Sequence, residues 1–314
     1  MHLDLSNAGM GDAVTAAWIA EGRKGLHPVT FNGGRNRRVL ELLGQVVTDE
    51  SGGIDLGDKG VWQYELAAAA MQNVALTRTT PWGTHITVRK PIQMPARPYL
   101  WQQVLPDFVE PRRPQANIPA AAWQSSEALL DGHAGRPIAL LFPCASYKTR
   151  MWPLRYWLRL AGELEDRGVF TYAMDGWQGN VKDFPRYGYG FSIETVAATM
   201  LRSHIVVGND SGPAHLAGTL EVPTIGIIGA CDPRVVWGHL ESVRAMRASP
   251  SRVPCVGCHF QREAGFAAMC DEGCDALRAV HAHEVAEAVF RILEEGHEPR
   301  CDTGQGVWSD RSTD

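Results

Sequence analysis

The sequence has no long apolar run and no excess of basic residues. No stretch approaches the roughly 18 uncharged apolar residues that span a bilayer, and residues 1–6 contain no basic segment leading into an apolar one. The 30 Lys and Arg residues against 35 Asp and Glu give a net charge of -5, so no general attraction to nucleic acid or to an acidic membrane is expected. We therefore expect a cytoplasmic globular protein without a membrane span.

Repeats of solenoid length and the composition of a disordered chain are also missing. Hydrophobic residues make up 45% of the sequence and charged residues 21%, and the mean hydropathy is -0.18, which are ordinary globular values. The length of 314 residues exceeds the usual size of one domain, about 100–200 residues. Two domains, each with its own core, are therefore predicted.

The seven cysteines are too few and too unevenly placed for a secreted disulfide framework. Four of them form two close pairs separated by a short loop: Cys255, Cys258, Cys270 and Cys274. This arrangement suits tetrahedral thiolate ligation of a structural iron or zinc, with free thiols or disulfides as the alternative. A site closed by four thiolates would leave no open position for chemistry.

Short apolar runs alternate with segments of helical period, which is typical of parallel βαβ units. In the first half the pattern predicts strands at 3–5, 28–31 and 45–47 and helices at 12–20 and 35–43. In the second half it predicts strands at 137–142, 169–174, 204–207 and 224–228 and helices at 154–167, 193–202, 213–220 and 284–295. Residues 91–119 are rich in proline and are predicted to be a connector. The fold class is thus α/β, with two Rossmann-like halves.

The most informative string is residues 206–218, VVGNDSGPAHLAG. A predicted strand ends just before Asp210 and Ser211, which take N-cap positions, and Pro213 suits the first helical turn. Free amides at such a helix start, beside a Ser hydroxyl and with Gly212 allowing close approach, form an anion site suited to a pyrophosphate. The alternative is that Asp210 and Ser211 only cap the helix.

Three strings occur in the order found in one known family. They are LSNAGMGDAV at 5–14, PCASYKTRMWP at 143–153, and NDSGPAHLA at 209–217, the last followed by VPT and GACDP. Together they resemble glycosyltransferase family 9, the ADP-heptose heptosyltransferases. The resemblance covers residues 136–295 and 3–20. Residues 50–135 do not match, and that region is expected to hold much of the acceptor site.

The resemblance implies a GT-B architecture of two facing Rossmann-like domains with a cleft between them. The predicted domains are an acceptor domain at 1–135 and a nucleotide-sugar domain at 136–296, with the four-cysteine insertion at 255–274 and a flexible tail at 297–314. The final helix is expected to pack back on the first domain. The implied reaction is an inverting sugar transfer, first of all of heptose from ADP-heptose, that requires no catalytic metal.

Cations and small polar residues follow the predicted strand that ends near Phe142. The resemblance places Ser146, Lys148 and Arg150 at the donor phosphates, where negative charge develops as the nucleoside diphosphate leaves. In the family a Lys commonly stands where Arg150 does, so Lys148 is a second candidate for that contact. The alternative is that both cations are solvated loop charges.

Asp12 is the candidate catalytic base, because single-displacement inversion needs a carboxylate that takes the proton of the acceptor hydroxyl. Gly11 allows a close approach to the backbone there. The competing interpretation is that Asp12 caps the first helix. Glycines 9 and 11 are not a dinucleotide fingerprint, since the third glycine of that motif would fall at Val14.

Two further residues are expected in the nucleotide-sugar domain. Asp175 follows a predicted strand, where ribose or base contacts are expected, or it only forms a turn. His215, one helical turn past Ser211, can reach a phosphate or the transferred sugar, or it packs between helix and sheet. The cysteine cluster resembles the four-cysteine iron finger of family members that glycosylate bacterial autotransporter adhesins, without matching it clearly in spacing.

Several functions remain open from the sequence alone. Besides the glycosyltransferase, they are a nucleotide-sugar epimerase or hydrolase on the same fold and a non-catalytic nucleotide-sugar-binding subunit that docks a partner through its cysteine hairpin. The expected partners are a nucleotide-sugar donor, ADP-heptose first, and an acceptor that is lipopolysaccharide core, a protein or a modified nucleobase. Self-association into a homo-oligomer is left open.

Overall fold

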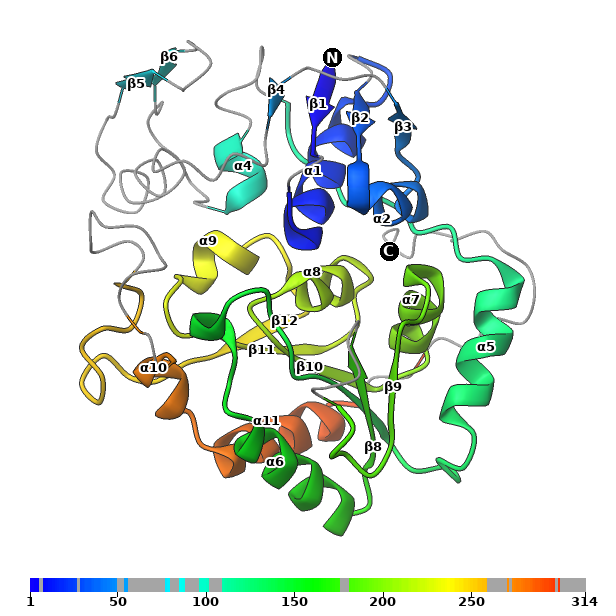
Figure 1. Ribbon diagram of the computed structural model, residues 1–314, viewed down its shortest axis with the longest axis vertical. Helices are drawn as coiled ribbons and strands as arrows, with labels where there is room; N and C mark the ends of the chain where they lie inside the picture. Colours follow the sequence, from blue (N-terminus) through cyan, green and yellow to red (C-terminus); the bar gives the residue numbers. More distant parts are fainter. Residues whose placement is uncertain are drawn as a thin grey trace.

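The computed structural model describes residues 1–5, 8–26, 29–49, 54–55, 77–79, 85–87, 96–101, 109–175, 181–258, 270, 273–296 and 299. Figure 1 shows two α/β units, the first in blue and cyan above the second in green to orange. One cluster of buried apolar side chains continues from Leu3 and Leu5 in the first unit to Leu216 and Ala217 in the second. The two units therefore pack directly against each other.

The first unit contains a four-stranded sheet in the order β3-β2-β1-β4, in which each pair of neighbours is parallel. The strands are β1 (His2–Asp4), β2 (Thr30–Asn32), β3 (Val46–Thr48) and β4 (Ile54–Asp55). Helix α1 (Met10–Arg23) follows β1, and a short 3-10 turn (Gly34–Asn36) and α2 (Arg37–Leu42) follow β2. The antiparallel pair β5 (Thr77–Thr79) and β6 (His85–Thr87) lies outside this sheet, and α4 spans Arg97–Trp101.

The second unit contains a six-stranded parallel sheet in the order β12-β11-β10-β7-β8-β9. Its strands are β7 (Ile138–Phe142), β8 (Phe170–Asp175), β9 (Tyr187–Tyr189), β10 (Ile205–Asn209), β11 (Thr224–Ile227) and β12 (Val243–Met246). Strands β7, β10 and β11 are buried along their whole length, because helices cover both faces of the sheet. Numbered within the unit, the order is that of the doubly wound dinucleotide-binding fold.

Helices cover the second sheet on both sides (Figure 1). The upper layer faces the first unit and holds α7 (Ile193–Leu201), α8 (Gly212–Thr219) and α9 (Pro233–Trp237), which contact α2, α1 and α4 respectively. The lower layer holds α6 (Leu154–Asp166) and α11 (Ala282–Glu294), with α10 (Asp275–Arg278) at one end. Helix α5 (Ala120–Leu130) runs between the units and packs on α7.

The predicted strands and helices named above are present, with ends shifted by a few residues. Within the predicted connector at 91–119 the structure has helix α4, so that prediction was wrong for this stretch. Helix α5 was missed because it buries only small or isolated residues on one face: Ala122, Ser126 and Leu130. Strands β9 and β12 and helices α9 and α10 are too short to give a periodic signal.

The final helix α11 packs on its own unit along its apolar stripe, and the predicted packing on the first domain stays a prediction. Val285, Val289 and Ile292 of α11 are buried in the core of the second unit, against α6, β10 and β11. The apolar stripe of the helix is thus covered by its own unit, on the side of the sheet away from α1 (Figure 1). The division at 135/136 remains a prediction, and almost all of the predicted tail at 297–314 lies outside the described residues.

None of the helices in the described part of the chain combines the length and the apolar character needed to cross a bilayer.

Candidate functional site

The candidate residues of the second unit meet at the carboxyl ends of three neighbouring strands. The segment with Ser146, Lys148 and Arg150 follows β7, Asp175 ends β8, and Asp210 follows β10. Strands β7 and β10 are hydrogen-bonded neighbours whose connections leave in opposite directions along the sheet. Such a switch point opens a crevice in which doubly wound sheets bind their ligands. The topology therefore brings these predicted residues to one place.

Helix α8 begins at this crevice. Ser211 is its N-cap residue with extended backbone, φ -151° and ψ 170°, and Pro213 occupies the first turn. The Ser211 hydroxyl donates to the Asn209 carbonyl at 3.3 Å and makes no capping bond to the helix amides. Pro213 has no amide N–H and the Ala214 amide donates to the Ser211 carbonyl at 3.2 Å, so it is the positive end of the helix dipole that α8 presents to the crevice. The Ser211 side chain therefore does not act as a simple helix cap.

Arg150 is held at the same edge by Asp210. The Arg150 Nε and Asp210 Oδ2 atoms are 3.6 Å apart, and the two side chains are 14% and 4% exposed. The Tyr147 ring lies 5.8 Å from the Arg150 guanidinium. Lys148 and Ser146 are exposed on the same loop. Of the two cations, Arg150 is therefore the one anchored beside the start of α8, and Lys148 extends toward solvent.

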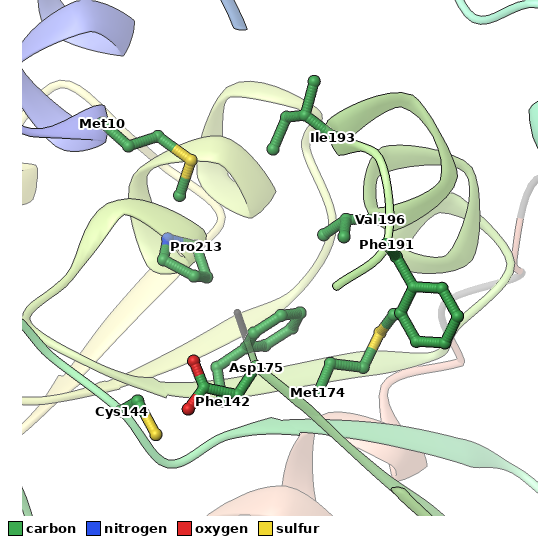
Figure 2. A pocket seen from close by; sticks show the side chains of 9 residues that line it. All are labelled: Met10, Phe142, Cys144, Met174, Asp175, Phe191, Ile193, Val196 and Pro213. Atoms are coloured by element: carbon green, nitrogen blue, oxygen red, sulfur yellow. The ribbon is translucent and has the colours of Figure 1, made fainter. Parts of the chain in front are cut away.

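A pocket of about 220 Å³ adjoins this site (Figure 2). The lining of this pocket is apolar except for one carboxylate and one thiol. The lining residues are Met10, Phe142, Cys144, Met174, Asp175, Phe191, Ile193, Val196 and Pro213. Figure 2 shows the Asp175 carboxylate turned toward the space between Cys144 and Pro213, with Met10 reaching in from α1. Among the sequence predictions only Asp175 belongs to this lining. The apolar residues were missed because each one alone is typical of a core strand or helix.

The two units interlock through glycines. A Cβ atom on Gly11 would lie 2.9 Å from Cδ2 of His215, and one on Gly212 would overlap the Met10 side chain. Each glycine thus makes room for a large side chain from the other unit. The space at Gly11, expected to admit an acceptor, is taken by the His215 imidazole, which is 2% exposed. His215 thus packs against the turn of the first unit, and its contact with a phosphate or the transferred sugar stays a prediction.

Asp12 caps its own helix. The Gly9 amide donates to Asp12 Oδ2 at 2.9 Å, and Asp12 stands at the third position of α1, where it makes the carboxylate half of a capping box, since Gly9 has no side chain to supply the other half. The side chain is 3% exposed and one residue from the Gly11–His215 contact. A carboxylate has about four lone-pair positions, so this bond leaves acceptor capacity. Capping and proton acceptance are compatible at this position, and the catalytic role stays a prediction.

The four cysteines lie beside the end of β11. Cys258 closes a tight turn in which its amide donates to the Cys255 carbonyl at 3.1 Å. Cys274 is the N-cap residue of α10, and its Sγ would lie 2.8 Å from a Cβ on Gly229, the second residue past β11. Burial raises the pKa of the Cys274 thiol, amides of Leu277 and Ala276 oppose this, and the thiols of Cys258 and Cys270 raise it further.

Those electrostatic effects place Cys258 and Cys270 near Cys274. Within the residues that the structure describes, however, no three or more His, Cys, Asp or Glu side chains are arranged as a metal-binding group. The donor set is chemically suited to iron or zinc, but its present arrangement does not fit either ion.

Comparison with known proteins gives one family. Residues 190–262 match the model of glycosyltransferase family 9 (heptosyltransferase). The chain is 29% identical over 106 residues to lipopolysaccharide heptosyltransferase 1 of Escherichia coli (strain K12), which is 31% of this chain and 33% of that protein. The match thus spans about a third of the length of this curated relative.

Two solved structures resemble nearly the whole chain. E. coli ADP-heptose lps heptosyltransferase II has a TM-score of 0.61 at 14% identity, covering 94% of this chain and 98% of that one. The iron-containing dodecameric glycosyltransferase TibC from enterotoxigenic E. coli has a TM-score of 0.57 at 12% identity, covering 94% and 76%. These findings confirm the predicted resemblance to family 9 and the GT-B fold.

Proposed function

We propose that this family 9-like chain, with its GT-B fold, is an inverting glycosyltransferase that moves heptose from ADP-heptose to an acceptor hydroxyl. One observation carries the proposal: the start of α8, the anchored guanidinium of Arg150 and an apolar pocket bearing Asp175 adjoin at one sheet edge. The similar proteins include E. coli ADP-heptose lps heptosyltransferase II, which supports ADP-heptose as the donor.

The crevice suits the parts of a nucleoside diphosphate in order. The apolar pocket accommodates a flat base, since ligand pockets combine apolar walls with few polar groups. Asp175 ends the second strand of its sheet, the position from which a carboxylate bonds ribose hydroxyls in doubly wound folds. The diphosphate then reaches the positive end of α8, the Ser211 hydroxyl and Arg150, with Lys148 close by on the same loop.

The reaction that follows is a single displacement. The acceptor oxygen attacks the anomeric carbon, the bond from that carbon to the diphosphate oxygen breaks, and the hydroxyl proton passes to the Asp12 carboxylate. Arg150 and the α8 dipole offset the negative charge that develops on the departing diphosphate. Asp12 lies across the unit boundary from that charge, because α1 packs on α8.

The donor assignment is tested by calorimetry with ADP, UDP, GDP and CDP on the purified chain. We expect ADP to bind most tightly. Arg150→Glu should weaken ADP binding by at least about tenfold, since it removes a charge-assisted contact and adds repulsion. Arg155→Glu is the matched control, because Arg155 is exposed on α6 and stacks on Tyr156 at 4.8 Å. Equal ADP affinity in both variants and wild type would refute the assignment.

Sugar release separates the transferase from its alternatives. ADP-heptose is incubated with the chain alone and with lipopolysaccharide core, protein and nucleobase acceptors. The proposal expects ADP formation that depends on an acceptor. Release of free heptose without acceptor would point to a hydrolase, and binding without turnover across acceptors would point to a binding subunit.

We further propose that the four cysteines hold one structural iron or zinc per chain. Their spacing and the electrostatic proximity of Cys258, Cys270 and Cys274 support this, and the TibC structure is described as iron-containing. Metal binding would have to draw the thiols closer together. Elemental analysis of protein prepared without chelators should find the metal, with loss in Cys270→Ser; protein without iron or zinc would contradict the proposal. The cytoplasmic location and the homo-oligomer stay predictions.

A further inference from the structure

Asn209, the last residue of β10, connects both ends of the loop that carries the candidate phosphate contacts. Its side chain is completely buried. Asn209 Nδ2 donates to the Pro143 carbonyl at 2.7 Å, and Asn209 Oδ1 accepts from the Trp152 amide at 3.0 Å. Pro143 and Trp152 stand immediately before and after the segment with Ser146, Lys148 and Arg150. One amide group thus fixes the entrance and the exit of this loop.

The exit is fixed from a second side as well. The Trp152 indole Nε1 donates to the Val280 carbonyl at 2.9 Å, and the ring is 1% exposed. Within the loop the only helical turn is the short 3-10 segment Lys148–Arg150, which is too small to hold its own shape. The position of Arg150 therefore depends on how its flanks are tied to β10 and to Val280, two residues before α11.

The hydrogen bonds of the Asn209 side chain also fix the position of the loop relative to the start of α8. Asp210, the residue after Asn209, pairs with Arg150 at 3.6 Å. Ser211 donates back to the Asn209 carbonyl. The side chain of Asn209 thus controls the loop after β7, and its main chain leads directly into the helix start. Asn209 therefore positions both parts of the proposed diphosphate site: the loop with Arg150 and the start of α8.

We infer that Asn209 is a positioning residue: it holds the 143–152 loop so that Arg150 faces the start of α8, and it thereby sets the affinity for a nucleoside diphosphate. The inference rests on the proposed function. Removing the carboxamide leaves a buried amide and a buried carbonyl without their partner, which is unfavourable in the folded state. The loop then becomes more mobile, and the entropy lost when the ligand orders it again lowers the affinity.

The first test measures the loop without any ligand. Asn209→Ser shortens the side chain so that it cannot span both partners. Thr224→Val is the matched control, because it removes a buried hydrogen bond (Thr224 Oγ1 to the Val222 carbonyl, 2.8 Å) on the neighbouring strand β11. Hydrogen–deuterium exchange should become faster across residues 146–152 in Asn209→Ser and stay at the wild-type rate there in Thr224→Val. Unchanged exchange in Asn209→Ser would overturn the inference.

The second test measures ADP binding by calorimetry. Asn209→Ser should weaken ADP by about tenfold, while Thr224→Val keeps wild-type affinity. If Asn209 acts through Arg150, the losses of Asn209→Ser and Arg150→Gln should be clearly less than additive in the double variant. Additive losses, or an equal loss in Thr224→Val, would overturn the positioning role. If wild type does not bind ADP, the proposed donor is wrong, and the exchange experiment still decides whether Asn209 holds the loop.

Discussion

The two units share the same strand topology but differ in how much structure surrounds the candidate residues. In each, the innermost strand order is that of a doubly wound sheet, and the segment that follows the first strand carries the candidate chemistry: Asp12 at the start of α1 and Arg150 in the loop after β7. A buried asparagine braces each loop. Asn36 Nδ2 donates to the Ala8 carbonyl at 2.8 Å in the first unit, and Asn209 plays the corresponding part in the second.

The difference lies in what surrounds the loops. The second unit adds two strands beyond β10 and completely buries three strands, so several loops converge on one crevice. The described strands of the first sheet have two or three residues, and that unit contributes a single carboxylate and Met10 to the site. Under the proposed function, donor binding is assigned mainly to the second unit and proton acceptance to Asp12 of the first, so a change at Asp12 separates the two.

The largest effect is expected from breaking that separation at Asp12. Asp12→Asn keeps an oxygen that can accept from the Gly9 amide, so the helix cap and ADP affinity should persist. The amide cannot take a proton, so the transfer rate should fall about 10²–10⁴-fold. The measurements are the transfer rate, ADP affinity and melting temperature of one preparation.

The control for this variant is Asp131→Asn, since Asp131 is an exposed turn residue that accepts from the Gly132 amide at 3.0 Å. It should behave as wild type in all three measurements. A normal transfer rate in Asp12→Asn would show that Asp12 only caps α1.

A smaller effect is expected from changing the contact between the units. Gly11→Ala brings a methyl group against the buried His215 ring, so the free energy of unfolding should fall by about 1–3 kcal/mol. Gly162→Ala is the matched control, because Gly162 lies within α6 and a Cβ there meets nothing within 4 Å. That variant should gain about 0.5–1 kcal/mol. Urea unfolding that shifts both variants in the same direction would contradict the interlocking contact.

The smallest effect concerns the internal anchoring of the second unit. Glu165 Oε1 accepts from the Thr171 amide at 2.7 Å and from the Thr171 hydroxyl at 2.8 Å, and it also pairs with Arg186. Burial raises the pKa of Glu165, but the hydrogen bonds of Arg186 and Thr171 outweigh it and hold the pKa below its ordinary value. A lowered folded pKa stabilises the fold above the unfolded pKa, about 4.3.

Glu165→Gln should therefore lower the free energy of unfolding at pH 7 by about 1 kcal/mol, a modest figure because the side chain is 20% exposed. The difference from wild type should shrink as the pH falls from about 4.3 through the lowered folded value. Glu127→Gln, with a 73% exposed side chain, is the control and should change little. Urea unfolding at several pH values decides, and a pH-independent difference would count against the ion pair as its source.

Much of the second unit could be predicted because its signals are local. The string 206–218 contains a strand end, a helix start and the Asp210–Ser211 pair within a few residues, and the structure has β10 and α8 there. Capping and strand burial depend on neighbours along the chain. The topology then brings the loops after β7 and β10 together without any further information from the sequence.

What could not be predicted depends on contacts between distant residues. The space at Gly11 belongs to His215, and the carboxamide of Asn209 bridges residues on another strand's loop. The residue type alone does not identify the partner, because a buried asparagine and a histidine on a helix have many possible neighbours. Two helices were missed for a different reason: α5 has a small buried face and a weak period, and α4 has only five residues in proline-rich surroundings.

The reciprocal glycines also determine which substitutions must be made in pairs. Gly212→Ala alone collides with Met10, and adding Met10→Ala removes the contacts of Cε and Cγ but leaves the Cβ of residue 10 at 2.7 Å from the new methyl group, so only Met10→Gly would clear the space. Because the two positions lie on different units and about 200 residues apart in the chain, neither reveals the dependence when it is varied singly. A redesign of the proposed donor crevice therefore has to vary Met10 and Gly212 together.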